Sequence, residues 1–173
     1  AAVAVVLFGA VAVFLLVGRS ESDAPGDDAR PTTAVPTVEP NGVVEYIVDG
    51  DTIDVSIDGV TERVRLIGID TPETKRPDFP VECFGPDASA FVTDLLPLGT
   101  AVRVERDTVG RDDYGRLLGY VYRADDALFV NAELVRLGYA QPLTIPPNTV
   151  HEPTFVDAAR QAEAADAGLW AAC

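Results

Sequence analysis

Apolar and polar residues alternate from Val43 onward, with the period of two that is typical of half-buried β-strands. The alternation is clearest over residues 52–57, and the Asp58-Gly59 dipeptide directly after it is a hairpin turn signal. The return strand of this hairpin is expected to run to Ile69. Two more strands are predicted over residues 100–106 and 117–122.

Apolar residues at helical spacing predict three helices, over residues 86–95, 130–137 and 152–167. A proline in the first turn and a glycine just past the end are typical helix boundaries, and both occur here. The proline-rich residues 142–148 are expected to form a loop. Strands first, one helix inserted and helices last indicate an α+β fold, a five-stranded β-barrel with three helices.

The first 18 residues carry no charge and are almost wholly apolar. A membrane span needs roughly 17–25 such residues and the core of a signal peptide about 7–15, so we expect a transmembrane anchor, with a signal segment as the alternative. Residues 19–41 are rich in Asp, Pro and Thr and are predicted to be a flexible linker to a domain over 42–173. Because the flank after the apolar segment is acidic, we expect that domain to be extracytoplasmic, either membrane-anchored or secreted.

The chain is strongly acidic, with 13 Lys and Arg residues against 28 Asp and Glu residues and a formal net charge of -15. Phosphate contacts normally require a basic face, so this balance is unusual for a protein that binds nucleic acid. One interpretation is a high-salt habitat, because at ~1 M salt the Debye length falls to about 3 Å and distant repulsion is weakened. The other is a genome composition that favours Arg, Ala and Asp.

Residues 65–74 combine a strand with a charged exit loop. The strand carries Arg65, and the loop that follows it carries Asp70 and Glu73 on either side of Thr71-Pro72. Pro72 keeps Thr71 out of helical conformation, so the chain leaves the sheet in a defined direction. Two carboxylates and a guanidinium at such a junction favour metal-assisted phosphoryl chemistry. The alternative for this stretch alone is a surface loop with solvated charges.

Two further motifs change this assessment. Asp49-Gly-Asp-Thr52 lies upstream and Asp113-Tyr-Gly-Arg116 lies downstream of the R-L-x-x-I-D-T-P-E stretch. Together, in this order, the three motifs resemble the staphylococcal nuclease family, and weaker similarity extends the resemblance over residues 43–170. The resemblance implies an oligonucleotide-binding-type barrel and a calcium-dependent nuclease that cuts DNA and RNA, leaving 3′-phosphate ends.

The resemblance also implies a role for each site residue. Two carboxylates and one carbonyl would hold Ca²⁺, one carboxylate would orient or deprotonate the attacking water, and two arginines would stabilise the phosphoryl transition state. In this sequence these are Asp51, Asp70 and the Thr71 carbonyl for the metal, Glu73 for the water, and Arg65 and Arg116 for the phosphate. Oxygen ligands suit Ca²⁺, and the planar guanidinium fork donates to two phosphoryl oxygens at once.

The substrate-binding region departs from the family pattern. Family members carry tyrosines around the nucleotide between the positions of Ala140 and His151, whereas this chain has no aromatic residue there. Asp113 stands where a lysine would hold a phosphate, but Tyr114 remains as a candidate for stacking on a base. His151 resembles a structural histidine, paired with Glu105, rather than a catalytic one.

Two alternatives to the enzyme stay open from the sequence. One is a non-catalytic nuclease-like module that binds nucleic acid or protein, and the other is a membrane-tethered calcium-binding barrel. We expect a monomer. Because an exported chain encounters oxidising conditions, Cys83 and Cys173 are predicted to form a disulfide, with two free thiols as the alternative.

Overall fold

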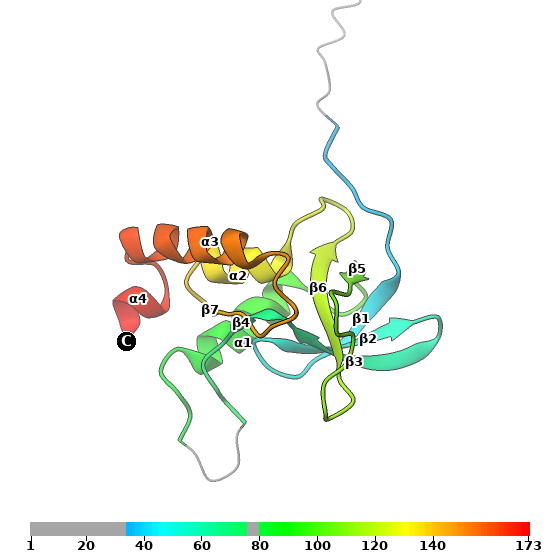
Figure 1. Ribbon diagram of the computed structural model, residues 1–173, viewed down its shortest axis with the longest axis horizontal. Coiled ribbons are helices and arrows are strands. Elements are labelled where there is room, and N and C mark those ends of the chain that lie inside the picture. Colours follow the sequence, from blue (N-terminus) through cyan, green and yellow to red (C-terminus); the bar gives the residue numbers. More distant parts are fainter. Residues whose placement is uncertain (1–33, 76–79) are drawn as a thin grey trace, which may run out of the picture. The chain divides into compact units, whose positions relative to one another are not determined.

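Five strands close into a barrel in the computed structural model, which describes residues 34–75 and 80–173 (Figure 1). Their order around the barrel is β1-β2-β3-β6-β5, with β3 and β6 parallel and the other paired neighbours antiparallel. The bounds are β1 Gly42–Ile47, β2 Thr52–Ile57, β3 Val60–Leu66, β5 Ala101–Glu105 and β6 Leu117–Arg123. The predicted five-stranded barrel is confirmed.

The alternating pattern decides which side chains fill the barrel. Ile53 on β2 lies opposite Val64 on β3, and neither side chain has any exposed surface. The next residue along β3, Arg65, lies opposite Thr52 and its side chain belongs to the other face of the strand. The hydrophobic core therefore fixes the register that directs Arg65 away from the interior.

The predicted helices are present, and the structure adds a short fourth helix and a two-stranded sheet. The helices are α1 Gly85–Leu95, α2 Val130–Arg136, α3 Glu152–Ala164 and the additional α4 Leu169–Ala172. A two-stranded sheet joins β4 Gly68–Asp70 to β7 Gln141–Leu143. The prediction of a loop over residues 142–148 was thus wrong for residues 142 and 143, which lie in β7. Proline is tolerated in β7 because this strand lies at the edge of its sheet, where a backbone N–H need not be paired.

Asn131 on α2 ties the helix to the barrel beneath the candidate site. Its side chain is fully buried, and its Oδ1 accepts a hydrogen bond of 2.9 Å from the N–H of Val121. Its Nδ2 donates to the carbonyl of Ile67 at 3.0 Å, at the corner between β3 and β4. A buried amide whose bonds are satisfied on two elements fixes their separation, and so fixes where the chain leaves β3.

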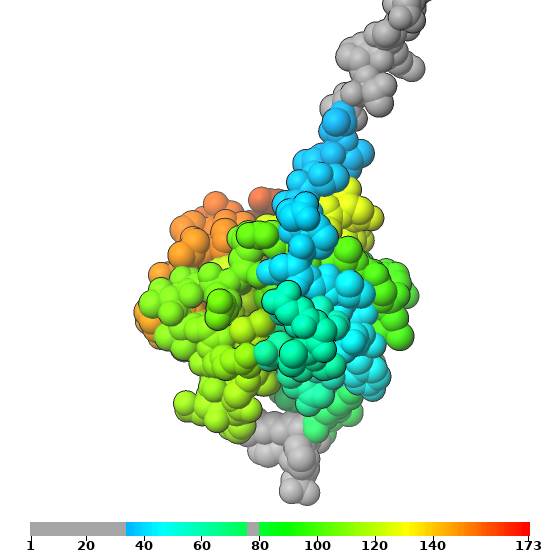
Figure 2. Space-filling model, turned by 90° about the vertical axis from the view of Figure 1, so that its right-hand side faces the viewer, coloured from blue at the N-terminus to red at the C-terminus, as the bar shows by residue number. Residues whose placement is uncertain are grey.

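The chain before β1 lies against the barrel over its last residues. The N–H of Val38 donates to the carbonyl of Ala124 at 3.0 Å, and Asn41 exchanges side-chain hydrogen bonds with the backbone of Val104. Figure 2 shows this segment, in blue, running onto the surface of the folded unit. The predicted apolar segment and most of the predicted linker lie outside the described residues. Of the helices that the structure does describe, none combines the length and the apolar character needed to cross a bilayer.

A disulfide joins Cys83, just before α1, to Cys173 at the end of the sequence, with a Cα–Cα distance of 6.0 Å. The predicted pairing is confirmed. The bond closes a loop of 90 residues, which includes α1, β5, β6 and the helices that follow.

Candidate active site

The predicted catalytic and metal-binding residues, which are scattered over more than sixty positions of the sequence, meet around one polar cavity of about 330 Å³. Its walls come from the β1–β2 turn and the start of β2, the end of β3, the end of β4 with the loop after it, and the residues just before α1 and β6. The lining residues are Asp49, Asp51, Thr52, Arg65, Asp70, Thr71, Pro72, Glu73, Glu82 and Arg116. Five carboxylates and two guanidinium groups thus share a single small space.

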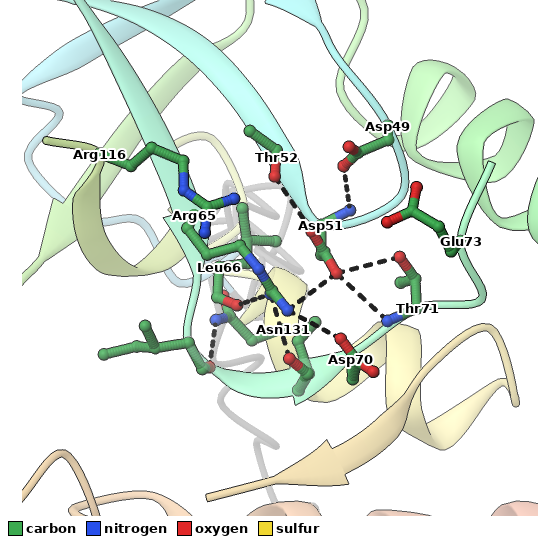
Figure 3. Close-up of polar contacts among 12 residues, drawn as sticks. Asp49, Asp51, Thr52, Arg65, Leu66, Asp70, Thr71, Glu73, Arg116 and Asn131 are labelled. Atoms are coloured by element: carbon green, nitrogen blue, oxygen red, sulfur yellow. Dashed lines mark hydrogen bonds and ion pairs between the residues drawn. The ribbon is translucent and has the colours of Figure 1, made fainter. Parts of the chain in front are cut away.

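Asp51 is the buried carboxylate of this cavity (Figure 3). Its Oδ2 accepts hydrogen bonds from the N–H and the hydroxyl of Thr71 at 3.2 and 3.1 Å, and its Oδ1 accepts one from the Thr52 hydroxyl at 3.0 Å. Burial raises the pKa of Asp51 to about 6, although nearby Arg65 opposes the shift. A Cβ on Gly50 would lie 2.7 Å from the Thr71 hydroxyl oxygen, so the close approach of Asp51 and Thr71 requires glycine there.

Arg65 lies between the two predicted metal-binding carboxylates. Its Nη2 is 3.0 Å from Oδ2 of Asp51 and 2.9 Å from Oδ1 of Asp70, as Figure 3 shows. Its Nη1 donates to the carbonyls of Leu66 and Ile69 at 2.6 and 3.1 Å. The guanidinium therefore supplies the positive charge that compensates Asp51 and also secures the backbone of the β3–β4 corner.

Glu73 follows the strand exit and its carboxylate is turned toward Asp49 and Asp51 (Figure 3). Its Oε1 accepts hydrogen bonds from the N–H groups of Thr74 and Lys75, at 2.9 and 2.8 Å. These two bonds hold one oxygen of the carboxylate in a fixed position. The described contacts leave its other oxygen, Oε2, available to the cavity.

Arg116 reaches the same cavity from the start of β6 and is held by Asp112. Its Nε donates to Oδ2 of Asp112 at 2.7 Å, and its N–H donates to Oδ1 at 2.8 Å. Burial alone would raise the pKa of Asp112, but the hydrogen bonds and the charge of Arg116 outweigh it and lower that pKa. Among the described residues, the guanidinium forms its hydrogen bond through Nε, and its two terminal nitrogens form none.

A second cavity of about 330 Å³ shares Arg65 and Arg116 with the polar one. Tyr114 lines it, with 87% of its surface exposed, and the Arg116 guanidinium lies 5.6 Å from the centre of its ring. Its other walls are mainly aliphatic, formed by Val109, Leu118, Leu143, Ile145, Pro146 and Pro147. The stretch that lacks the family's tyrosines therefore still forms an apolar wall, and Asp113 adds an acidic group to it.

The oxygen donors of the polar cavity suit a hard cation. Asp51, Asp70 and the Thr71 carbonyl are the kind of ligand that Ca²⁺ prefers. The raised pKa of Asp51 shows that the charge of this buried carboxylate is incompletely compensated. Within residues 34–75 and 80–173, no group of three or more His, Cys, Asp and Glu side chains is placed to hold a metal ion. The predicted set contains two carboxylates, so a backbone carbonyl would have to complete it.

His151 is not among the described residues that line either of these cavities. Its Nε2 is 3.4 Å from the hydroxyl of Tyr122, and its ring packs edge-on against Tyr120 at 4.5 Å between centroids. The expected partner Glu105 is instead bonded to Nε of Arg103 at 2.7 Å. The histidine is thus placed in an aromatic cluster, and its expected pairing with Glu105 was wrong because Arg103 competes for that carboxylate.

Three residues of the site were not predicted: Asp49, Glu82 and Asp112. Asp49 Oδ1 accepts the N–H of Asp51 at 3.2 Å, which shapes the turn between β1 and β2. Its place two residues before Asp51, next to glycine, is a turn signal that could have identified it. Asp112 stands four residues before Arg116, a spacing that also allows an ion pair. Glu82 carries no sequence signal that links it to the site.

Comparison with known proteins agrees with this geometry. The family described as "Staphylococcal nuclease homologue" matches residues 63–172. The thermonuclease of Staphylococcus intermedius is 39% identical over 128 residues, covering 74% of each chain, and that of Staphylococcus hyicus is 36% identical over 124 residues, covering 72% of each. Endonuclease YncB of Bacillus subtilis (strain 168) is 36% identical over 132 residues, which are 75% of this chain and 61% of the relative. The chain belongs to the staphylococcal nuclease family.

Proposed function

We propose that this chain is a calcium-dependent nuclease that hydrolyses phosphodiester bonds of DNA and RNA and leaves 3′-phosphate ends. The observation that carries the proposal is that Glu73, Arg65 and Arg116 line one cavity. The two predicted metal-binding carboxylates, Asp51 and Asp70, line the same cavity. Family membership, with relatives named thermonuclease and endonuclease, supports a nucleic-acid hydrolase.

The arginines would act on the charge that develops on the phosphoryl oxygens. Arg116 is held at Nε by Asp112, so its two terminal nitrogens are preorganised and can donate to two oxygens of one phosphate. Preorganised donors stabilise a transition state because they need no reorientation during the reaction. Arg65, which lines both cavities together with Arg116, contributes a second positive charge.

Glu73 would orient the attacking water or accept its proton. The N–H groups of Thr74 and Lys75 hold Oε1, so Oε2 is the atom that would receive the water's proton. A base held in this way can take up the proton of the water as the water attacks the phosphorus.

Asp51, Asp70 and the Thr71 carbonyl would hold Ca²⁺, which when bound would neutralise charge on the phosphoryl oxygens. The contribution of the chain is to supply these ligands on a rigid wall: Asp51 is fixed by Thr52 and Thr71, and Asp70 ends strand β4. Tyr114 and the aliphatic cavity beside it would receive a base, since stacking requires only an apolar face and contributes ~1–3 kcal/mol.

An extracytoplasmic location is part of the same proposal. The Cys83–Cys173 disulfide supports it, because such bonds persist in oxidising compartments. The anchor or signal role of the apolar first 18 residues remains a prediction.

The decisive experiment is digestion of plasmid DNA and of RNA by the purified protein, with Ca²⁺ and with a chelator. We expect both substrates to be cut only with Ca²⁺, and the products to be extended by a polymerase only after phosphatase treatment, which reveals a 3′-phosphate. Binding of either nucleic acid without turnover, at any salt concentration, would instead support the non-catalytic module.

A further inference from the structure

Glu82 is bonded to both peptide groups that flank the Cα of Glu73. The N–H of Glu73 donates to Oε2 of Glu82 at 2.9 Å, and the N–H of Glu82 donates to the carbonyl of Glu73 at 2.9 Å. Fixing both peptide groups restricts φ and ψ of Glu73, and these angles set the direction in which its side chain leaves the backbone.

The residues around Glu82 are held in turn by helix α1 and the disulfide. The N–H of Gly85 donates to the carbonyl of Glu82 at 3.1 Å. A Cβ on Gly85 would lie 3.0 Å from the carbonyl oxygen of Pro72 and 3.2 Å from that of Glu73, so the helix start is packed closely against the backbone before Glu73. Cys83, the residue after Glu82, is bonded to Cys173.

We propose that Glu82, anchored by the Cys83–Cys173 disulfide, is a positioning residue for Glu73. This rests on the proposed function, in which Glu73 acts on the attacking water. Glu82 acts through the backbone of Glu73, and it is Glu73 that acts on the reacting atoms. Its loss should therefore lower turnover more than substrate binding, because a small displacement of a catalytic group reduces the rate while the arginines still bind the phosphate.

The kinetic test compares three variants in the full chain at saturating Ca²⁺. Glu82→Ala removes the acceptor, and we expect kcat to fall roughly 10- to 100-fold with KM nearly unchanged, the range that a displacement of about 1 Å produces. Glu82→Gln removes the charge but keeps an oxygen that can accept the Glu73 N–H, so most of the turnover should return. Glu163→Ala, an exposed glutamate on α3, is the matched control and should leave kcat unchanged.

A double-mutant cycle separates positioning from a general loss of structure. In a Glu73→Gln background, Glu82→Ala should have little further effect on kcat, because the group that it positions is already inactive. An equal loss of kcat in both backgrounds, or a Glu82→Ala enzyme with the turnover of the wild type, would overturn the proposal. A Glu82→Gln variant as slow as Glu82→Ala would also overturn it, since charge rather than the hydrogen bond would then be responsible.

Amide hydrogen exchange of Glu73, measured by NMR, gives a readout that does not need activity. Exchange at this N–H should accelerate at least tenfold in Glu82→Ala and in the same direction in the Cys83→Ser/Cys173→Ser variant, while amides of the barrel core keep their protection. A wild type without nuclease activity would refute the proposed function alone. Unchanged exchange at Glu73 in a folded Glu82→Ala protein would refute the positioning role alone, whether or not the disulfide variant folds.

Discussion

Asp51→Asn should stabilise the metal-free protein. Burial raises the pKa of Asp51 from 3.8 to about 6, against the opposing effect of Arg65. The carboxyl therefore binds its proton more tightly in the folded chain than in the unfolded one. The resulting contribution to stability is fully present below about pH 4 and is lost as the pH rises through about 6. Since each pKa unit corresponds to about 1.4 kcal/mol, ionisation of Asp51 should lower the free energy of unfolding by about 3 kcal/mol at pH 7.

Urea unfolding in the presence of a chelator, from pH 4 to pH 7.5, measures this contribution. The asparagine variant has no carboxyl to ionise at this position, so its free energy of unfolding should exceed that of the wild type by an amount that grows with pH and approaches about 3 kcal/mol at pH 7. Asp157→Asn, which removes an exposed carboxylate on α3, is the control and should show a difference that is small across the range.

Calcium should reduce the difference between the two proteins. A ligand present at a hundred times its Kd stabilises the folded state by about 2.7 kcal/mol, so the wild type should recover most of the deficit while the asparagine variant, which has lost an anionic ligand, gains less. A difference that stays constant between pH 4 and pH 7.5, or a metal-free variant less stable than the wild type at pH 7, would refute the assignment of Asp51 as a buried and poorly compensated carboxylate.

Four further outcomes are expected. Cys83→Ser/Cys173→Ser should lower the free energy of unfolding by up to about 4–5 kcal/mol in calorimetry, because the bond closes a 90-residue loop, and an unchanged Tm would contradict this. Glu73→Gln should reduce kcat strongly but leave the Ca²⁺ Kd from titration calorimetry nearly unchanged. Arg116→Lys keeps the charge but loses the fork, so kcat should fall a hundred- to thousandfold, which is ~3–4 kcal/mol, with a smaller change in KM. Residues 42–173 carry 11 basic and 23 acidic side chains, a balance of -12, so kcat/KM should persist at salt concentrations that abolish ordinary nuclease binding, and a steady collapse from low salt upward would count against a high-salt habitat.

The barrel could be predicted because local pattern and core packing agree. Alternation places Ile53 and Val64 on the same buried face, and the Asp58-Gly59 turn sets their register. No such pattern marks the pairing of Ile69 with Pro142, since it joins three-residue strands more than seventy positions apart. Short strands with a proline carry too few alternating positions to be recognised, so that sheet is visible only in the structure.

The residues of the site could be predicted more readily than their partners. Motifs identify Asp51, Asp70 and Glu73, but a motif does not state which atoms a side chain meets. The role of Glu82 depends on how the chain returns to the start of α1, nine residues after Glu73, and no sequence periodicity describes that return. Contacts of this kind arise from tertiary packing, and positioning residues are therefore the part of a site that sequence reasoning is least able to find.

The two arginines illustrate the same limit, because their motifs predict equal roles while their surroundings differ. Arg65 is committed to four partners, two carboxylates and two backbone carbonyls, and its side chain is 15% exposed. Arg116 is held mainly through Nε by one carboxylate and is 32% exposed. Removing Arg65 would leave Asp51 buried without its cation, whereas removing Arg116 would release a partly exposed Asp112. Both the stability of the fold and the chemistry therefore depend on Arg65. At Arg116, the effect of a substitution on the chemistry can be separated from its effect on the fold.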